Sequence, residues 1–235
     1  MGPCRLAGVP SRSQPQPDRL DATRNSPPGL PSGSDGSGDV ITDVAALTQQ
    51  CQGCQACPLA ASRQQVVVGR GNPQARLLLI GEGPGAEEDA RGLPFVGRSG
   101  QLLDRLLTEA GLDPARDLYI ANIVKCRPPQ NRRPTAQEMA ACRPWLDRQI
   151  ALIDPPLILL AGATAVQGLL GIKGGISRLR GQWQPWQGRK LLPLFHPAYL
   201  LRQPRRGPGQ PIDLTLGDLI NARGHLQALT DPAGA

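Results

Sequence analysis

The sequence predicts an α/β fold with three α/β/α layers, in which helices cover both faces of a central, four-stranded, mainly parallel sheet. Apolar residues make up 40% of the 235 residues, which is enough for one sizeable core. Short apolar runs of strand length alternate along the chain with segments of helical periodicity. Since a parallel strand must be followed by a crossover, usually a helix, this alternation is typical of a parallel sheet covered on both sides.

Each expected element has a local signal of its own. Leucines on one face of residues 101–110 predict a helix that stops at Gly111. Thr135 and Glu138 form a capping box, so a helix should begin there, and Pro144 should kink it or divide it in two. In chain order we expect strands over 76–80, 119–124, 157–160 and 191–195, and helices over 101–110, 135–153, 163–170 and 214–229.

The predicted strands place three loops at one edge of the sheet. Ligands of parallel α/β sheets bind at the carboxyl ends of the strands. The segments that follow the first, second and fourth strands are 81–89, 125–133 and 196–202. We therefore expect these three loops to converge on one site.

The chain divides into a tail and one domain. Residues 1–38 are rich in Pro, Gly, Ser and Gln, so we expect them to be disordered and residues 39–230 to form the folded domain. No apolar run approaches the ~20 residues of a membrane span, and the N-terminus lacks the apolar stretch of a secretion signal. We expect a cytoplasmic protein without a membrane partner, and we expect it to act as a monomer.

The distribution of charge points to a polyanionic partner. The formal net charge is +7, and residues 155–212 contain no Asp or Glu. Such a stretch is usually a solvated basic face, but its length without an acid favours the phosphates of a nucleic acid. Its basic residues are Lys173, Arg178, Arg180, Arg189, Lys190, Arg202, Arg205 and Arg206.

Five of the six cysteines are spaced like metal ligands. Cys51, Cys54 and Cys57 follow one another at intervals of three, and Cys126 and Cys142 lie far along the chain. A close pair can face one metal centre, and two distant cysteines can complete it. Spacing alone leaves zinc and iron–sulfur equally open and makes a thioredoxin-like redox pair less favoured. One of the five is in excess, and Cys4, in the tail, has no expected role.

Four features could form a ligand pocket. The glycines of 81–85 could make an ordinary turn or could allow close approach of a neutral planar ligand, since Pro84 and the nearby acids do not suit a phosphate. Phe95 could be a core anchor or a stacking ring. Asn122, in an apolar strand, could satisfy a backbone group or read the edge of a base. His196 could be structural, but its place at a strand end favours the site.

Together these segments resemble the family 4 uracil-DNA glycosylases, the iron–sulfur branch of the uracil-DNA glycosylase superfamily. The resemblance covers about residues 50–225 and rests on five ordered motifs. They are CQACPL at 54–59, GEGPGAEED at 81–89, GLPFVG at 92–97, NIVKCRPPQN at 122–131 and HPAYLLR at 196–202. The resemblance implies base excision repair: hydrolysis of the N-glycosidic bond of deoxyuridine in single- or double-stranded DNA, which leaves an abasic site.

The resemblance also implies roles for individual residues. A 4Fe-4S cluster would be bound by Cys54, Cys57, Cys126 and Cys142, which leaves Cys51 as the extra cysteine. His196 would donate a hydrogen bond to the leaving base. The uracil pocket would be formed by Glu82, Gly83, Pro84, Phe95, Asn122 and His196, and Tyr199, Leu200, Leu201 and Arg202 would contact DNA.

The resemblance does not identify the residue that activates water. Gly83 stands where the family 1 enzymes carry a water-positioning Asp, so the activating group must differ. Glu88 is the candidate, Asn131 could position water instead, and a capping role for Glu88 is nearly as well favoured.

Two other functions compete with uracil excision. One is a glycosylase of the same superfamily with another base specificity, such as thymine opposite guanine or hypoxanthine. The other is a non-catalytic, metal-stapled module that binds nucleic acid, which would explain the charge and the cysteines. Such a module would not need Phe95, Asn122 and His196 in this order, so we favour the enzyme.

Overall fold

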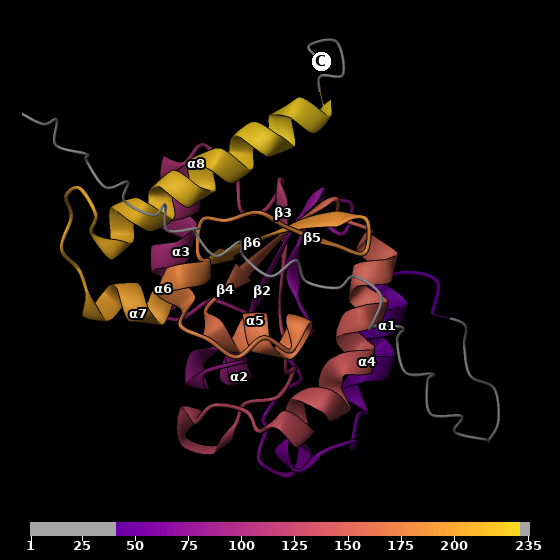
Figure 1. Cartoon of the computed structure of the whole chain (residues 1–235). Helices are drawn as coiled ribbons and strands as arrows, with labels where there is room; N and C mark the ends of the chain where they lie inside the picture. The colour runs from indigo at the N-terminus through magenta and orange to yellow at the C-terminus, as the bar shows by residue number, and fades with distance from the viewer. Residues whose placement is uncertain (1–40, 231–235) are drawn as a thin grey trace, which may run out of the picture. The chain divides into compact units, whose positions relative to one another are not determined.

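Within residues 41–230, which this computed structural model describes, a six-stranded sheet forms the centre of the protein (Figure 1). The tail predicted over residues 1–38 lies outside the described residues. The strand order is β1-β3-β2-β4-β6-β5. The strands are β1 (Arg70–Gly71), β2 (Leu77–Gly81), β3 (Leu118–Asn122), β4 (Leu157–Ala161), β5 (Gln184–Trp186) and β6 (Arg189–Leu194).

The four inner strands of the described sheet are parallel, and the two edge strands are antiparallel. β3, β2, β4 and β6 pair in parallel, as the sequence predicts. β1 pairs with β3 and β5 pairs with β6 in the antiparallel sense. The predicted count of four strands is therefore too low by these two. β1 has two residues and β5 has three, which is too short for an alternating pattern to be read from the sequence.

Helices lie on both sides of the sheet (Figure 1). The predicted helix over 163–170 is confirmed, and the other predicted helices agree within a few residues at each end. No helix of the described part of the chain is long and apolar enough to span a membrane. The helices are α1 (Val44–Gln52), η1 (Pro58–Ala61), α2 (Ala86–Arg91), α3 (Arg98–Glu109), η2 (Pro129–Asn131), α4 (Ala136–Ile153), α5 (Ala163–Leu170), α6 (Ile176–Leu179), α7 (Pro197–Arg202) and α8 (Pro211–Thr230).

Helix α4 begins at the predicted capping box. The Thr135 backbone N–H donates to Glu138 Oε2 at 2.7 Å, and the Glu138 N–H donates to Thr135 Oγ1 at 3.2 Å. The helix continues through Pro144 to Ile153 without a break, so of the two effects predicted for Pro144, a kink or a division, the division is wrong. Apolar residues on both sides of Pro144 pack into the same core, which holds the two halves in one helix.

Each face of the sheet has its own core. Every residue of β2, β3 and β4 is buried, and successive side chains of a strand point to opposite faces. Leu78 and Ile80 share one core with apolar side chains of α4 and α5. Leu77 and Leu79 share the other with side chains of α3, α7 and α8. The predicted α/β/α layers are thus confirmed.

The strand order places a crevice at the carboxyl end of β2. From β2 the chain adds β3 on one side and then β4 and β6 on the other, so the connections leave β2 in opposite directions. Open α/β sheets bind their ligands outside the strand ends at such a point. The loops after β2, β3 and β6 meet there.

Candidate active site and cysteine pocket

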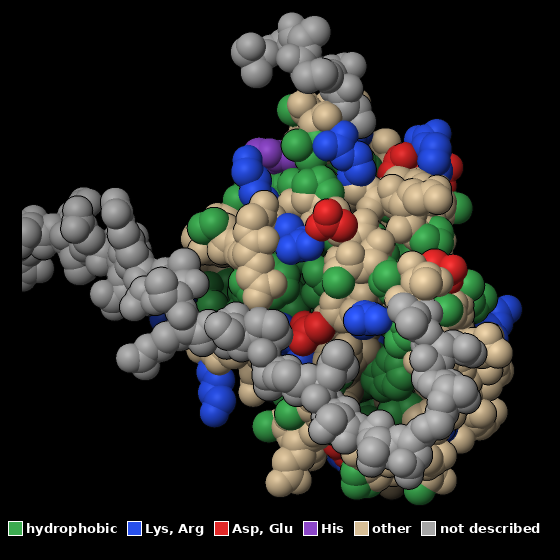
Figure 2. Space-filling model, turned by 90° about the vertical axis from the view of Figure 1, so that its right-hand side faces the viewer, with side chains coloured by type: hydrophobic (Ala, Val, Ile, Leu, Met, Phe, Trp, Pro, Cys, Tyr) green, Lys and Arg blue, Asp and Glu red, His purple; other side chains and the backbone are tan. Residues whose placement is uncertain are grey.

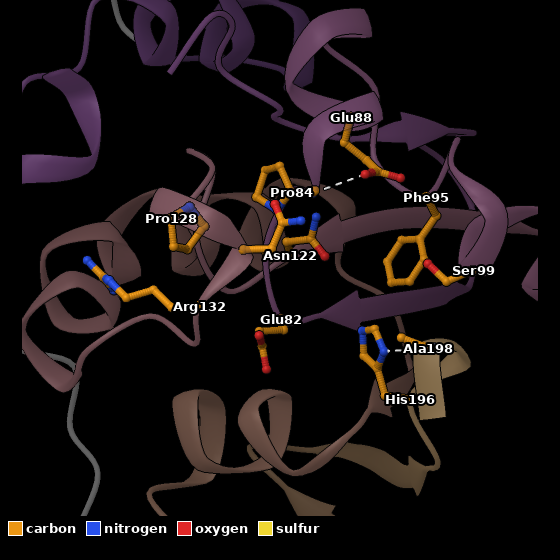
Figure 3. A pocket seen from close by; sticks show the side chains of 13 residues that line it. Glu82, Pro84, Glu88, Phe95, Ser99, Asn122, Pro128, Arg132, His196 and Ala198 are labelled. Carbon is orange, nitrogen blue, oxygen red and sulfur yellow. Dashed lines mark hydrogen bonds between the residues drawn. The ribbon is translucent and has the colours of Figure 1, made fainter. Parts of the chain in front are cut away.

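A cavity of about 240 Å³ lies at the carboxyl ends of the parallel strands. It contains residues from all three loops that the sequence predicts to converge, together with the loop that carries Phe95 (Figure 3). The predicted uracil-pocket residues all line it. The lining consists of Glu82, Gly83, Pro84, Gly85, Glu88, Phe95, Ser99, Asn122, Pro128, Asn131, Arg132, His196 and Ala198.

Phe95 forms an aromatic side of the cavity. Its backbone has a φ of +54°, in the left-handed region that a bulky residue adopts only when its surroundings hold it there. Arg70 provides one restraint, because its Nε donates to the Pro94 carbonyl at 2.8 Å while its guanidinium pairs with Asp104 at 2.6 Å. Phe95 is 6% exposed, so the ring is largely fixed before any ligand enters.

Gly81, the last residue of β2, permits the close approach of two site residues. A Cβ at this position would lie 2.4 Å from Phe95 Cζ and 2.5 Å from Asn122 Oδ1. Both contacts are far shorter than packed atoms allow. Any larger residue at Gly81 would therefore displace the ring, the carboxamide or both.

Asn122 ends β3 with its carboxamide in the cavity (Figure 3). The side chain is 2% exposed, and its Oδ1 has no hydrogen-bond partner among the described residues. Most buried polar atoms are hydrogen-bonded, because an unpaired buried acceptor costs about 1–3 kcal/mol. An acceptor of this kind, on a side chain that lines a cavity, is available to a ligand that donates a hydrogen bond.

His196 follows β6 and caps helix α7. Its Nδ1 accepts a hydrogen bond from the Ala198 backbone N–H at 3.1 Å, so in the neutral ring the proton is on Nε2. Burial lowers the pKa of His196, which favours this neutral form. Its ring centre lies 6.0 Å from that of Phe95. Gly162, with φ +92°, leaves room for the imidazole, because a Cβ there would lie 2.8 Å from His196 Cβ.

Glu82, Gly83 and Pro84 form a further side of the cavity, directly after β2 (Figure 3). The Glu82 carboxylate is half-buried and lies 4.0 Å from the Arg133 Nε. Arg133 in turn donates to Thr164 Oγ1 at 3.0 Å. These contacts connect the loop after β2 with the loop after β3 and the start of α5.

Glu88 lines the cavity but its oxygens already have partners. Oε2 accepts the Gly85 N–H at 3.0 Å, and Oε1 accepts the N–H groups of Val96 and Gly97 at 3.0 and 2.9 Å. The carboxylate therefore ties the glycine loop after β2 to the loop that carries Phe95. This is the capping contact that the sequence left as an alternative for Glu88.

Several lining residues were not predicted from the sequence. Ser99 lies in the first turn of α3, just after the motif at 92–97, so only its proximity to Gly97 could have indicated it. Ala198 lies in the first turn of α7, inside the predicted segment 196–202, but it was not named as a site residue. Pro128 and Arg132 belong to the predicted loop after β3. Asn131 also lines the cavity, and its Oδ1 accepts the Arg127 Nε–H at 2.7 Å.

The residues expected to contact DNA lie on helix α7 instead of an open loop. Tyr199 and Leu201 are half-buried and Arg202 is exposed. Leu200 is fully buried and packs in the core that α3 and α8 share with the sheet. Leu200 therefore cannot contact DNA as predicted unless α7 unfolds, because its side chain faces the core from the inner side of a short helix.

The five spaced cysteines line one pocket beside α4. Cys51 lies in the last turn of α1, Cys54 and Cys57 follow it, Cys126 follows β3, and Cys142 is in α4. Three separate chain segments are thus brought together, as the spacing suggests. Within residues 41–230, no three His, Cys, Asp or Glu side chains form a group that could hold one metal ion.

N–H groups already surround three of the sulfur atoms. The Lys125 backbone N–H donates to Cys142 Sγ at 3.3 Å, and Trp145 Nε1 donates to Cys54 Sγ at 3.3 Å. Arg63 approaches Cys126 Sγ at 3.5 Å. Burial raises the pKa of Cys142 to about 11 and also raises that of Cys126. A metal centre would have to displace their protons, after which the N–H groups would stabilise the thiolates.

The fold and the cavity define a class of protein. The sequence profile of the Uracil DNA glycosylase superfamily matches residues 68–220. That range contains the whole sheet and every residue that lines the cavity. The chain belongs to this superfamily.

Known relatives place the chain more narrowly. It is 49% identical over 158 residues to a type-4 uracil-DNA glycosylase of Thermotoga maritima. That alignment covers 66% of this chain and 82% of the relative. It is 41% identical over 167 residues to a type-4 enzyme of Saccharolobus solfataricus, covering 67% and 77%. Identity to a type-5 uracil-DNA glycosylase of Thermus thermophilus is 33% over 194 residues, covering 66% and 86%. The chain is a member of the type-4 family, which confirms the resemblance seen in its motifs.

Proposed function

We propose that this protein is a uracil-DNA glycosylase, which hydrolyses the N1–C1′ bond of deoxyuridine in DNA and leaves an abasic site. The names of its type-4 relatives support this activity. The cavity supports it independently, since it combines a fixed aromatic ring, a buried carboxamide and a neutral imidazole in one place.

The observation that carries the proposal is the unpartnered Oδ1 of Asn122. The N3–H of uracil can donate to this oxygen while the uracil O4 accepts from the Asn122 Nδ2. Cytosine has an acceptor and a donor in the opposite places, so both hydrogen bonds would be lost. Asn122 would therefore select the base, and Phe95 would stack on it.

His196 would stabilise the leaving base. The bonding electron pair of N1–C1′ leaves with uracil, and part of its negative charge develops on O2. The Nε2–H of neutral His196 can donate to that oxygen, because Nδ1 is occupied by Ala198. A water molecule then adds to C1′, and the proton that it gives up ends on the uracil anion, so the products are uracil and an abasic deoxyribose.

We assign Glu88 the role of positioning the loops around the cavity, and we propose that Asn131 positions the attacking water. The three backbone N–H groups that donate to Glu88 leave its carboxylate poorly placed to take a proton from water. Asn131 lines the same cavity, and the hydrogen bond from Arg127 fixes its carboxamide. Glu82, Gly83 and Pro84 would form the backbone wall of the uracil pocket.

DNA would approach from the open end of the cavity. Tyr199, Leu201 and Arg202 lie on α7, directly after His196, and would contact the strand beside the flipped nucleotide. The side of the molecule drawn in Figure 2 carries α1 and α4, and its Lys and Arg side chains lie singly with acidic ones between them. Bases mixed with acids in this way attract phosphates less strongly than the same bases alone would.

The cysteine pocket would hold a 4Fe-4S cluster bound by Cys54, Cys57, Cys126 and Cys142. A donor set of four cysteines with N–H groups directed at the sulfur atoms suits such a cluster. The cluster distributes its ligands over four iron atoms, so the thiols need not converge on one point. The hydrolysis needs no electron, so the group would supply structure. The cytoplasmic location and the monomeric state stay predictions.

A glycosylase assay with matched oligonucleotides tests the proposal. Wild-type protein should release uracil from single-stranded and duplex DNA and should leave thymine, hypoxanthine and cytosine in place. Release of another base would favour the alternative specificity, and DNA binding without any release would favour the non-catalytic module. Asn122→Asp should lose discrimination against cytosine, with unchanged DNA affinity; unchanged discrimination would remove Asn122 from its proposed role.

A further inference from the structure

Lys125 is a fully buried cation between the cavity and the cysteine pocket. Its side chain is 1% exposed, and within residues 41–230 it forms no ion pair with a carboxylate. Moving an ammonium group out of water is costly unless negative charge and hydrogen-bond acceptors surround it. Something in its surroundings must therefore offset that cost.

Two oxygen atoms account for part of the stabilisation. The Nζ donates to the Asn122 carbonyl at 2.7 Å and also to Gln149 Oε1. Gln149 is itself fully buried, and its Nε2 donates to the Val68 carbonyl at 2.9 Å. An ammonium group has three N–H donors, so among the described residues these two neutral acceptors leave one donor unused and no carboxylate to balance the positive charge.

The cysteine pocket can supply the missing charge. Lys125 lines this pocket together with the five cysteines, and its backbone N–H donates to Cys142 Sγ at 3.3 Å. Four thiolates that bind iron would carry negative charge into a pocket whose remaining lining is apolar except for Arg63, at its Cys126 side, and Lys125. A cation fixed at the wall of that pocket would offset the desolvation cost of both charges.

We propose that Lys125 is a positioning residue that pairs with the thiolate ligands of the cysteine pocket and, through the same ammonium, holds the Asn122 carbonyl in place. Occupation of the pocket by the cluster then supports the carboxamide that reads the base. The iron–sulfur cluster would then have a structural role in base recognition, in an enzyme whose reaction involves no electron transfer. It rests on the proposed uracil-DNA glycosylase function.

Lys125→Met removes the charge at nearly constant side-chain length. The purified variant should retain at most about a tenth of the wild-type iron and sulfide, since the thiolates lose their buried cation. Single-turnover uracil excision by the remaining iron-containing protein should fall by about tenfold or more, with DNA affinity unchanged. Lys125→Arg keeps the charge and should restore iron binding in part.

Arg105→Met is the control for the loss of a positive charge, because Arg105 is exposed on α3 and lines neither the cavity nor the cysteine pocket. It should retain wild-type iron and excision. Full iron content in Lys125→Met overturns the proposal, as does wild-type excision by that variant. If the wild-type protein excises no uracil, the proposed function fails, whereas loss of iron in Lys125→Met alone would still support the pairing.

A second measurement does not depend on the folding of a variant. Hydrogen exchange of wild-type protein is compared before and after iron is removed with an oxidant and a chelator. Amides of residues 119–125 should lose protection by about tenfold or more, while those of β4, which is separated from β3 by β2, should keep theirs. Equal loss in both segments, or loss in neither, contradicts the coupling.

Discussion

The cavity at the strand ends and the cysteine pocket both take residues from one short segment, 122–126, but they are built in opposite ways. The cavity takes its groups from the ends of parallel strands and keeps a polar atom, Asn122 Oδ1, without a partner in the described chain. The cysteine pocket is formed by helices and loops beside the sheet, and its sulfur atoms already accept N–H groups from Lys125 and Trp145.

We infer from this difference that the cavity serves the reaction and that the cysteine pocket serves the stability of the fold. Unpaired groups at a preorganised cavity are available to a ligand and contribute little to holding the fold together. Sulfur atoms that bring three chain segments together stabilise the fold once they share a metal centre. Substitutions in the cavity should therefore change excision with little effect on stability, and substitutions in the cysteine pocket should do the reverse.

The largest effect is expected at His196. His196→Ala removes the donor to the leaving base, so single-turnover uracil excision should fall by a factor on the order of 100 to 1,000. DNA affinity, iron content and the free energy of unfolding should change little. His225→Ala is the matched control, because His225 lies on α8 against Trp183, away from the cavity. Equal losses in excision and DNA binding would count against the proposed role.

Cys142→Ser should act mainly on stability. Loss of a ligand should abolish the iron content and lower the free energy of unfolding by about 3 kcal/mol or more, because a group that binds only the folded chain stabilises it by its binding free energy. Denaturant unfolding and iron analysis measure both quantities.

Cys51→Ser is the control for that experiment. Cys51 lines the same pocket but is the extra member of the set, so its substitution should leave the iron in place. Loss of iron in both variants would show that the assignment of the four ligands is wrong.

The smallest effect concerns pH. Burial lowers the pKa of His196 in the folded protein below its ordinary value of 6.5. Between the two values the unfolded chain binds a proton that the folded chain does not, so His196 should reduce stability as the pH falls below about 6.5. Protonation would also displace the Ala198 N–H from Nδ1.

Single-turnover excision should thus be constant from neutral pH upward and should decline below the lowered pKa of His196. Measurements between about pH 5 and 8, with His196→Ala for comparison, test this prediction. A wild-type rate that increases on acidification, but does not do so in His196→Ala, would mean that the imidazolium form is the active donor.

Much of the fold could be predicted because its signals are local. Strands β2, β3, β4 and β6 are short apolar runs. The capping box of Thr135 and Glu138 predicts the start of α4 from four consecutive residues. The convergence of the three loops also follows from the sequence, since parallel strands carry their carboxyl ends to the same edge.

The basic stretch shows that the charge available to a partner cannot be predicted from the sequence. Residues 155–212 contain no acid, yet Arg180 pairs with Asp218, Arg189 with Asp154 and Arg206 with Glu109. Each partner lies outside the stretch. A count along the chain cannot find them, because ion pairs depend on distance in space, and the positive charge left for DNA is smaller than the sequence suggests.

By itself, the sequence determined the parallel sheet, the order of the site segments and the spacing of the cysteines. The tertiary structure alone decided that Leu200 faces the core, that Glu88 accepts three backbone N–H groups, and that Lys125 lies between the two pockets. Periodicity and spacing express contacts within a few residues. The burial and hydrogen-bond partners of a side chain depend on segments that only folding brings together.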